Sequence, residues 1–552
     1  MKDYKPKLFS VIKNYTKEQF IKDVVSGIIV AIIALPLSIA LALASGASPE
    51  QGIYTAIFAG FVIAFLGGSR VQIAGPTAAF ATIVAGIIAE HGYEGLVIAT
   101  VMAGIILIIM GFCKLGNLIR FIPYTITTGF TFGIAVTIFL GQIKDFLGLT
   151  FTNSPVETID KVKEVIACIG TFNLHAFIVG MVSLLILILW PKKLEKIPSS
   201  LIVVIVSVLM VKFLPLDVKT IGDLYTISNK IPSISFPHIT FAMVKELLPN
   251  AFTIAILAAI ESLLSCVVAD GMIGSHHKPN AELIAQGAGN VVSALFGGIP
   301  ATGAIARTAA NIKNGGRTPI AGMVHSVTLL LVLVILMPYA AWIPMPAIAA
   351  ILFMVAYNMS GWKEFVRLCK ISPKSDTLVM VLTFGLTVVF DLVVAIEVGL
   401  MLAAILFLKR MSDVTDIKSW IYVKDMDEDE DPDSISLREV PKHTLVYEIN
   451  GPMFFAASNK FLTISSSKDT KVIILRMRGV PAMDISALHT LRAIVEDCKK
   501  EGITVLLSHV EEQPMNMMKK AGFDELIGVE NYCSHIDDAL ERAAKLVDTK
   551  SA

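Results

Sequence analysis

Two ionisable residues, Glu261 and Arg307, stand inside long apolar stretches of the sequence. If these stretches cross a membrane, each charge costs ~2.5–3.5 kcal/mol at the bilayer centre, so each needs a partner or a function. Burial favours the neutral form of a carboxyl group, and a carboxyl group in a membrane segment is therefore suited to carrying a proton. Ser262 and Ser265 add hydroxyl oxygens near Glu261, and Ser265 lies one helical turn further on the same face. We predict that Glu261, Ser262 and Ser265 form a site for a coupling ion.

A short motif rich in small residues and proline occurs twice, as IAGPTAA at positions 73–79 and as GGIPATGA at positions 297–304. Proline at a helix start has no amide hydrogen to lose, and small neighbours allow close approach by a ligand. Helices that begin at Pro76 and just after Pro300 would expose free N–H groups and positive dipole ends within the membrane. Such helix ends bind anions.

Three side chains add to this predicted anion site. Thr77 and Thr302 supply hydroxyl donors, and Arg307 lies about one turn into the second helix, where its charge would attract an anion. Two alternatives remain open for Arg307: a structural salt bridge with an acidic neighbour, or a position near the inner membrane surface that its long side chain can reach. For Glu261 the alternative is an ion pair with Arg307 that has no role in transport.

Other polar residues in or near apolar segments fit structural roles better. Asp270, Asp391 and Glu397 lie near the expected helix ends, where a carboxylate can reach water. His276 and His277 are followed by a lysine, which indicates a solvated basic loop and not a metal site.

Composition indicates a membrane protein. The 552 residues are 55% hydrophobic and 17% charged, with a mean hydropathy of +0.71, and the apolar blocks approach the ~20 residues needed to cross a bilayer. The zero net charge gives no reason to expect a nucleic-acid partner. The six cysteines are scattered without a CxxC pair, so we expect neither disulfides nor a metal site, and no cofactor.

The apolar pattern predicts fourteen membrane segments. They are expected to start near Asp23, Gly52, Val71, Gly95, Ile119, Leu174, Ser199, Leu247, Ala281, Gly303, Thr318, Ile343, Lys374 and Asp391. Basic residues gather in the N-terminal segment and in alternate loops, which predicts that both termini face the cytoplasm. These loops include Arg70, Lys114, Arg120, Lys192, Lys193, Lys196, Lys278, Lys313, Arg317, Lys363, Arg367, Lys370, Lys409 and Arg410.

The two motifs also indicate an internal repeat. Pro76 and Pro300 are 224 positions apart, and the same offset carries Asp23, at the first segment, onto Leu247, at the eighth. An odd number of segments in each half inverts the second copy, and inverted repeats with broken helices mark the binding site in many secondary transporters. Gly and Pro are also frequent in membrane helices in general, which is the alternative explanation.

These residues resemble the SulP family of sulfate permeases and inorganic anion transporters. The stretches at 67–77, 298–308 and 390–411 are similar to that family's third, tenth and final membrane segments. The resemblance implies a seven-plus-seven inverted repeat, a core domain that moves past a gate domain in an elevator-like step, and a homodimer. Glu261 occupies the family's acidic position. The anion would lie against Pro76, Thr77, Ala78, Thr302, Gly303, Ala304 and Arg307.

The polar C-terminal region resembles a STAS domain. Strands expected at 444–451, 471–477 and 504–508 alternate with helices expected at 486–501, 513–521 and 534–547, which is typical of an α/β layer structure. In related domains a phosphorylatable serine follows the aspartate at a helix start, but Ile485 stands there in this chain, and Ser486 is expected to cap the helix. The resulting domains are a cytoplasmic segment at 1–22, a transmembrane domain at 23–410, a linker at 411–440 and the STAS domain at 441–552.

The sequence therefore predicts a secondary active transporter of the plasma membrane, not an enzyme. Moving a dianion into a cell against ~100 mV costs ~4.6 kcal/mol, so uptake needs a co-transported cation, an exchanged anion or a steep gradient. We expect proton-coupled uptake of sulfate or a similar small anion. The family's Gln and Tyr are absent from the first segment at 36–41, so bicarbonate and C4-dicarboxylates also stay candidates. Sodium symport, anion exchange, a nucleobase carrier, a passive channel and a sensor are the alternatives.

Overall fold

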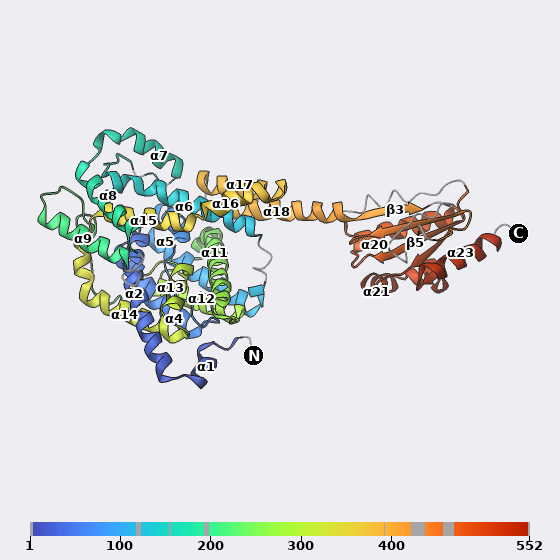
Figure 1. Ribbon diagram of the computed structural model, residues 1–552, viewed down its shortest axis with the longest axis horizontal. Helices are drawn as coiled ribbons and strands as arrows, with labels where there is room; N and C mark the ends of the chain where they lie inside the picture. Colours follow the sequence, from blue (N-terminus) through green and yellow to red (C-terminus); the bar gives the residue numbers. More distant parts are fainter. Residues whose placement is uncertain are drawn as a thin grey trace. The chain divides into compact units, whose positions relative to one another are not determined.

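The computed structural model describes residues 4–117, 123–153, 155, 157–191, 198–390, 392–420, 435, 438–455 and 469–549. The chain forms two compact units, Met1–Leu400 and Met401–Ala552. The first is helical and the second contains a five-stranded sheet (Figure 1). Seven helices in the described part are long and apolar enough to cross a membrane by themselves, and shorter apolar helices accompany them.

Among the described residues, the helices group into fourteen segments, seven in each half of the repeat. Helix α5 supplies two segments of the first half, because Gly92 breaks it with a φ of 69°. The first-half helices are α2 (Lys17–Ala44), α3 (Pro49–Tyr54) continued through the π turn η3 (Thr55–Ala59) into α4 (Gly60–Leu66), α5 (Ala78–Phe112), α6 (Tyr124–Leu147), α8 (Leu174–Leu189) and α9 (Ser199–Phe213). The second-half helices are α11 (Phe241–Ile273), α12 (Pro279–Leu295), α13 (Ile305–Lys313), α14 (Pro319–Leu336), α15 (Met345–Ser360), α17 (Lys374–Val389) and α18 (Leu392–Val414).

The expected segment starts are confirmed within a few residues for most helices. Helices α8, α9 and α17 begin at the predicted residues Leu174, Ser199 and Lys374. The third segment is the largest difference: a start near Val71 was predicted, but α5 begins seven residues later, because the intervening residues are extended. The predicted starts at Ile119 and Asp391 lie outside the described residues, as do Arg120, Lys192, Lys193 and Lys196.

Two short strands, one from each half of the repeat, pair with each other in the first unit. They are called the crossing strands below, and the place where they meet is called the crossing. Strand β1 (Ala74–Gly75) precedes α5, strand β2 (Thr302–Gly303) precedes α13, and they pair antiparallel, with Ala74 opposite Gly303. The helices expected at Pro76 and just after Pro300 begin at Ala78 and Ile305, two and five residues later, whereas the segment start expected near Gly303 is confirmed within two residues. Residues 301–304 are extended because they bond to other segments, as in the Ala304 N–H donated to the Ile73 carbonyl at 2.8 Å.

The repeat is confirmed, with a register that shifts along the chain. Helices α2 and α11 begin at Lys17 and Phe241, which keeps the predicted offset of 224 positions (241 − 17). Helices α5 and α13 begin at Ala78 and Ile305, an offset of 227 (305 − 78). The offset between corresponding helix starts therefore differs by three residues between the first and the third segments of the repeat.

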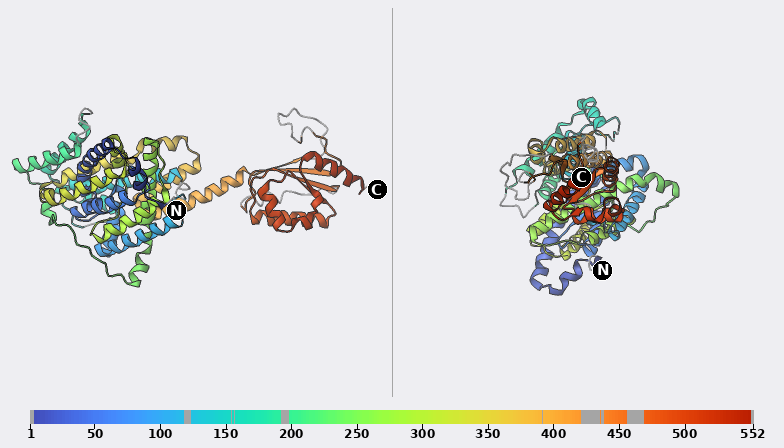
Figure 2. Two further views of the ribbon diagram at one scale, coloured as in Figure 1. Left: turned by 90° about the horizontal axis from the view of Figure 1, so that it is seen from below. Right: turned by 90° about the vertical axis from the view of Figure 1, so that its right-hand side faces the viewer.

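Helices from the two halves pack in pairs, so ribbons of early and late sequence colours mix throughout the first unit (Figures 1 and 2). Helix α5 packs on α11 and α12, and α2 packs on α14, whereas α6 packs on α15 and α17. Gly104 and Gly287 allow α5 and α12 to meet closely, since a Cβ at Gly287 would lie 2.4 Å from the Gly104 carbonyl oxygen. Small residues of this kind let membrane helices approach each other.

The second unit is an α/β fold. Its sheet has the order β3 (Asp416–Trp420), β4 (Thr444–Asn450), β5 (Val472–Gly479), β6 (Thr504–Ser508) and β7 (Tyr532–Cys533), with β3 antiparallel to β4 and the other pairs parallel. Buried apolar residues lie on both faces of the sheet, so the central strands are rich in apolar residues without strict alternation. The helices are α20 (Ile485–Lys500), α21 (Glu512–Lys520), α22 (Phe523–Ile527) and α23 (Ile536–Thr549).

The three predicted strands and three predicted helices of this unit are confirmed, and two details differ. Strand β3 lies within the stretch expected to be a linker, where it pairs with β4. The helix cap is also not Ser486 as predicted: the Asp484 carboxylate accepts the Ala487 N–H at 2.8 Å and caps α20.

Candidate anion and coupling-ion site

The start of α5 is joined to α11 by a hydrogen bond between the two halves of the repeat. Thr77 is the N-cap residue of α5, but its side chain does not cap the helix. The Thr77 hydroxyl instead donates to Oε2 of Glu261 at 2.9 Å. Glu261 is half-buried, and this hydrogen bond holds its carboxylate against the start of α5. The predicted anion residue Thr77 and the predicted coupling residue Glu261 therefore touch.

Ser262, the neighbour of Glu261, bonds to the other strand. Its hydroxyl lies 2.7 Å from the Thr302 hydroxyl and accepts the Gly303 N–H at 3.1 Å. Thr302 and Gly303 are buried, and the Thr302 hydroxyl also lies 3.1 Å from the Ala258 carbonyl oxygen of α11. Ser262 thus fastens β2 to α11, one position along the helix from the carboxylate.

Ser265 is directed at α13. Its hydroxyl donates to Oγ1 of Thr308 at 3.4 Å, and Thr308 Oγ1 accepts the Ile73 N–H at 3.0 Å. The structure therefore separates the three predicted coupling-ion residues: Glu261 faces Thr77, whereas Ser262 and Ser265 hydrogen-bond to residues of the second half-helix and its strand.

Arg307 joins the half-helices from the opposite side. It is the third residue of α13, in the first turn, so the prediction that it lies one turn into the helix is corrected. It is 4% exposed and donates from one terminal nitrogen to the Pro76 carbonyl, while its other terminal nitrogen has no hydrogen-bond partner. A Cβ at Gly75 would lie 2.6 Å from this second nitrogen, so a larger residue there would displace the guanidinium.

The alternative ion pairs of Arg307 and Glu261 are not found in the described part of the chain. Among the residues that the structure describes, no carboxylate pairs with Arg307, and Glu261 bonds only to Thr77. The half-helices α5 and α13 begin beside antiparallel strands, so their N-terminal ends both lie at the crossing, next to Ala78 and Ala304. Unpaired N–H groups of the first helical turns and the positive dipole ends then act together with the Arg307 charge. This arrangement can hold an anion.

Asp270 and Glu397, for which structural roles were expected, have different surroundings. Asp270 accepts hydrogen bonds from both the backbone and the ring of His277, which occupies that histidine without a metal. In the described part of the chain, no three His, Cys, Asp or Glu side chains are grouped as metal ligands. Glu397 is exposed on α18, and Asp391 lies outside the described residues.

Two buried carboxylates near the crossing were not predicted. Asp23 accepts hydrogen bonds from Tyr15, Gln19 and the start of α14, and Glu282 accepts four from neighbouring groups. A sequence signal existed for the second, because Glu282 is the only acidic residue between Asp270 and Glu364. Glu282 was not predicted because it lies only three residues after Pro279, in the first turn of α12, where an acidic residue is common at the surface end of a helix.

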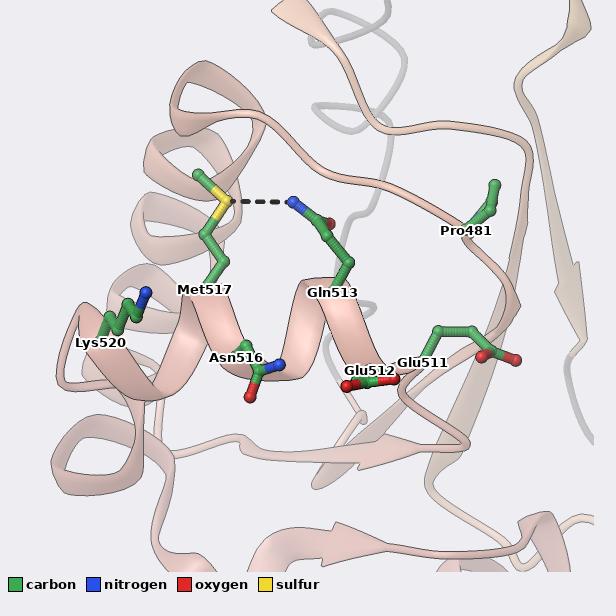
Figure 3. Close-up of a pocket in the computed structure, with 7 residues that line it drawn as sticks. All are labelled: Pro481, Glu511, Glu512, Gln513, Asn516, Met517 and Lys520. Atoms are coloured by element: carbon green, nitrogen blue, oxygen red, sulfur yellow. Dashed lines mark hydrogen bonds between the residues drawn. The ribbon is translucent and has the colours of Figure 1, made fainter. Parts of the chain in front are cut away.

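The hollow drawn in Figure 3 is separate from this chemistry. It lies in the second unit along α21, where the Gln513 amide points to the Met517 sulfur at 3.9 Å and also bonds the backbone of Met483. The residues that line it are Pro481, Glu511, Glu512, Gln513, Asn516, Met517 and Lys520. None of the predicted site residues is among them.

Comparison with known proteins identifies relatives across nearly the whole chain. Residues 20–383 match the sulfate permease family and residues 434–543 match the STAS domain. The candidate sulfate transporter YvdB of Bacillus subtilis (strain 168) is 40% identical over 531 residues, which cover 95% of this chain and 98% of YvdB. The bicarbonate transporter BicA of Picosynechococcus (strain PCC 7002) is 30% identical over 544 residues, 94% of each chain.

Solved structures share the fold. The murine Solute Carrier 26 family member A9 anion transporter in its inward-facing state aligns over 98% of this chain and 94% of its own, with a TM-score of 0.87 and 19% identity. The transmembrane domain of a cyanobacterial BicA aligns over 71% of this chain and 98% of its own, with a TM-score of 0.62 and 27% identity. The helical transporter fold with a C-terminal STAS domain, predicted from the sequence, is confirmed.

Proposed function

Because this chain belongs to the sulfate permease family, we propose that it is a secondary active transporter that takes up sulfate or a similar small anion together with protons. The observation that carries this proposal is the hydrogen bond between Thr77 and Glu261, which connects the expected anion site to the expected coupling residue. In the proposed site the anion contacts Pro76, Thr77, Ala78, Thr302, Gly303, Ala304 and Arg307.

The position of Glu261 gives a physical reason for symport. An ionised Glu261 next to the half-helix ends repels an incoming anion, while a protonated Glu261 does not, and the repulsion is strong where water is scarce. Anion binding and proton binding at this site therefore favour each other, and such coupling is reciprocal. A carrier that moves both together gains the charge neutralisation that uptake of an anion against the membrane potential requires.

Sodium is the second candidate for the coupling ion. A sodium ion would neutralise Glu261 as a proton does, with the Thr77 hydroxyl and backbone carbonyls as further oxygen ligands. In this version Ser262 and Ser265 would have to leave their hydrogen bonds with Thr302 and Thr308 to reach the ion. The similarity to two bicarbonate transporters supports bicarbonate as the alternative anion, and a C4-dicarboxylate stays a further candidate.

Transport would follow an elevator-like step in a homodimer of the plasma membrane, with both termini cytoplasmic. In this scheme a first set of helices, α5, α11 and α12, which pack on one another, moves past a second set, α6 with α15 and α17 packed on it. The crossing strands belong to the first set, so the anion and the coupling ion would move together with it.

The proposal is tested by uptake into proteoliposomes. Radiolabelled sulfate, bicarbonate and a C4-dicarboxylate are supplied with an inward proton gradient, an inward sodium gradient or neither. We expect one anion to be accumulated with the proton gradient alone. Uptake that occurs only with the sodium gradient would show that sodium, and not the proton, is the coupling ion. Competition by uracil would indicate a nucleobase carrier, and conductance without dependence on either gradient would indicate a channel.

Removal of the STAS domain should leave anion binding intact. A chain that ends at Thr415 keeps α18, which closes at Val414, and every proposed ligand lies within Met1–Leu400. We expect its anion affinity, measured by calorimetry, to stay within about threefold of the full chain, a difference below 1 kcal/mol. The transport rate and the dimer stability are expected to fall. A truncated protein that keeps its helical content but no longer binds the anion would contradict this division of roles.

A further inference from the structure

Glu282 is a fully buried carboxylate that is satisfied without a cation. It lies in the first turn of α12, next to the positive end of that helix. Its Oε2 accepts the N–H groups of Gly68 at 2.8 Å and Ser69 at 3.1 Å, and its Oε1 accepts the amides of Gln72 at 2.8 Å and Gln286 at 3.0 Å. Four donors converge on two oxygens, an arrangement that only the ionised carboxylate accepts completely.

Gln72 extends this contact to the site. Its amide N–H donates to Glu282 of α12, and its amide oxygen accepts from the Cys266 thiol of α11 at 2.6 Å. The same amide lies flat against Gly303 of β2, where a Cβ would be 2.3 Å from the amide nitrogen and 2.6 Å from the amide carbon. Gln72 is 5% exposed and stands two residues before β1. The Gln72 side chain therefore contacts α11, α12 and β2, and its backbone continues into β1.

The other half of the repeat holds its strand in the same way, with neutral groups. The Ile299 N–H donates to the Thr55 hydroxyl at 2.7 Å, and the Ala301 N–H donates to the Asn290 side-chain oxygen at 2.8 Å. Thr55 and Glu282 are 227 positions apart (282 − 55), the offset that also relates the half-helices. Thr55 and Glu282 thus each bind the residues that precede the strand of the opposite half, and of these two only Glu282 carries a charge.

We infer that Glu282 and Gln72 are positioning residues that fix the crossing strands against α11 and thereby align Thr77 with Glu261. The inference rests on the proposed function, because alignment matters only if the crossing binds the anion. Neither residue touches the anion in this scheme. The Glu282 carboxylate accepts four hydrogen bonds at once. Any replacement leaves at least one buried donor without an acceptor, or forces that donor to rotate away.

Glu282→Gln tests the inference in the full-length protein. The glutamine keeps the size of the side chain, but its own N–H₂ group faces the amide of Gln72 or Gln286, so one of these must rotate away. We expect sulfate, or the anion identified by the uptake panel, to bind about tenfold more weakly, which equals ~1.4 kcal/mol. The half-saturation concentration for transport should rise more than the maximal rate falls.

A double exchange separates positioning from folding. Glu282→Gln combined with Gln72→Glu restores one carboxylate and one amide, keeps the net charge, and again pairs positions 72 and 282. The glutamine oxygen at 282 can still accept from Gly68 and Ser69. We expect this variant to recover affinity to within about threefold of the original protein, a difference below 1 kcal/mol. Recovery would not occur if position 282 served only as a fixed charge in α12.

Asp23→Asn is the matched control. Asp23 is equally buried and accepts hydrogen bonds from Tyr15, Gln19, Arg317 and Thr318, but it touches neither crossing strand. We expect Asp23→Asn to lower the thermal unfolding temperature without changing the anion affinity. Unchanged affinity in Glu282→Gln, with affinity lost in Arg307→Ala, would overturn the inference and leave the proposed function standing. Unchanged affinity in Arg307→Ala together with loss in Glu282→Gln would instead overturn the proposed site.

Discussion

Replacement of Glu261 by glutamine is expected to abolish accumulation of the anion by a pH gradient while exchange of internal for external anion continues. The glutamine has the size of the original residue, and its amide oxygen can still accept the Thr77 hydroxyl that now bonds to Oε2 at 2.9 Å. It is permanently neutral, so the anion no longer needs a proton to enter the site. Binding survives, but the free energy of the proton gradient is no longer connected to anion movement.

The measurement is a pair of assays on the same proteoliposomes. Counterflow with anion on both sides reports exchange, and uptake with an inward proton gradient reports coupling. Glu397→Gln is the control, because Glu397 is an acidic residue of α18 that is exposed and remote in sequence from the crossing strands. We expect that control to accumulate anion like the original protein. If the Glu261→Gln variant still concentrates the anion with an inward proton current, Glu261 is not the coupling residue, and Glu397 and Asp391 become the next candidates.

The residues with the clearest chemistry could be found from sequence because they break a pattern. Glu261 and Arg307 are ionisable residues in apolar stretches, and Pro76 and Pro300 mark interruptions of membrane helices. Each of these signals is local. Their mutual arrangement was not available, because Thr77 and Glu261 are separated by 184 positions and Arg307 and Pro76 by 231. Which donor meets which acceptor over such separations depends on the tertiary fold.

The extended strands explain why some predicted positions were displaced. The stretches 71–75 and 299–304 are rich in apolar and small residues and fit a membrane segment, yet they are not helical, and β1 and β2 within them pair with each other. In a hydrocarbon layer every backbone group must find a partner, and nonhelical backbone is tolerated only where other protein segments supply one. Asn290 and Thr308 supply such partners here. The side chains that hydrogen-bond to the backbone at a break in a helix lie on other segments. The sequence therefore predicts that the helix breaks, but not how many residues the break contains.

The second unit was easier to predict because its pattern is simple. Strands β4, β5 and β6 are mostly buried and rich in apolar residues, and helix α20 between two of them is amphipathic. Strand β3 was missed because its sequence, DIKSW, lacks such a run, and β7 has only two residues. Position 484 illustrates the local limit: Asp and Ser are both good helix caps, and only the hydrogen bond from Ala487 distinguishes Asp484 from Ser486.

Arg307→Ala is expected to remove most of the anion affinity and leave a folded protein. The Arg307 charge is buried at the start of α13, has no carboxylate partner among the described residues and retains one unpaired terminal nitrogen. Unit charges ~4–8 Å apart attract by ~2–4 kcal/mol at an effective dielectric constant of ~20. The affinity should therefore fall by about thirtyfold or more, since each ~1.4 kcal/mol is a factor of ten. The half-helix ends alone contribute a weaker and less selective field.

Two further variants separate the charge from the bond to Pro76. Arg307→Lys keeps the charge but replaces the guanidinium with a single ammonium group, so partial binding in this variant assigns the effect to electrostatics. Arg317→Ala is the matched control, because Arg317 also donates to backbone carbonyls, those of Ile312 and Gly316, without reaching the crossing strands. Calorimetry with the transported anion and thermal unfolding would be measured for all three proteins. The opposite outcome is near-normal affinity in Arg307→Ala, with an unfolding temperature lowered as in Arg317→Ala. Arg307 would then only stabilise the packing of the two half-helices, and the anion would bind to the helix N-terminal ends.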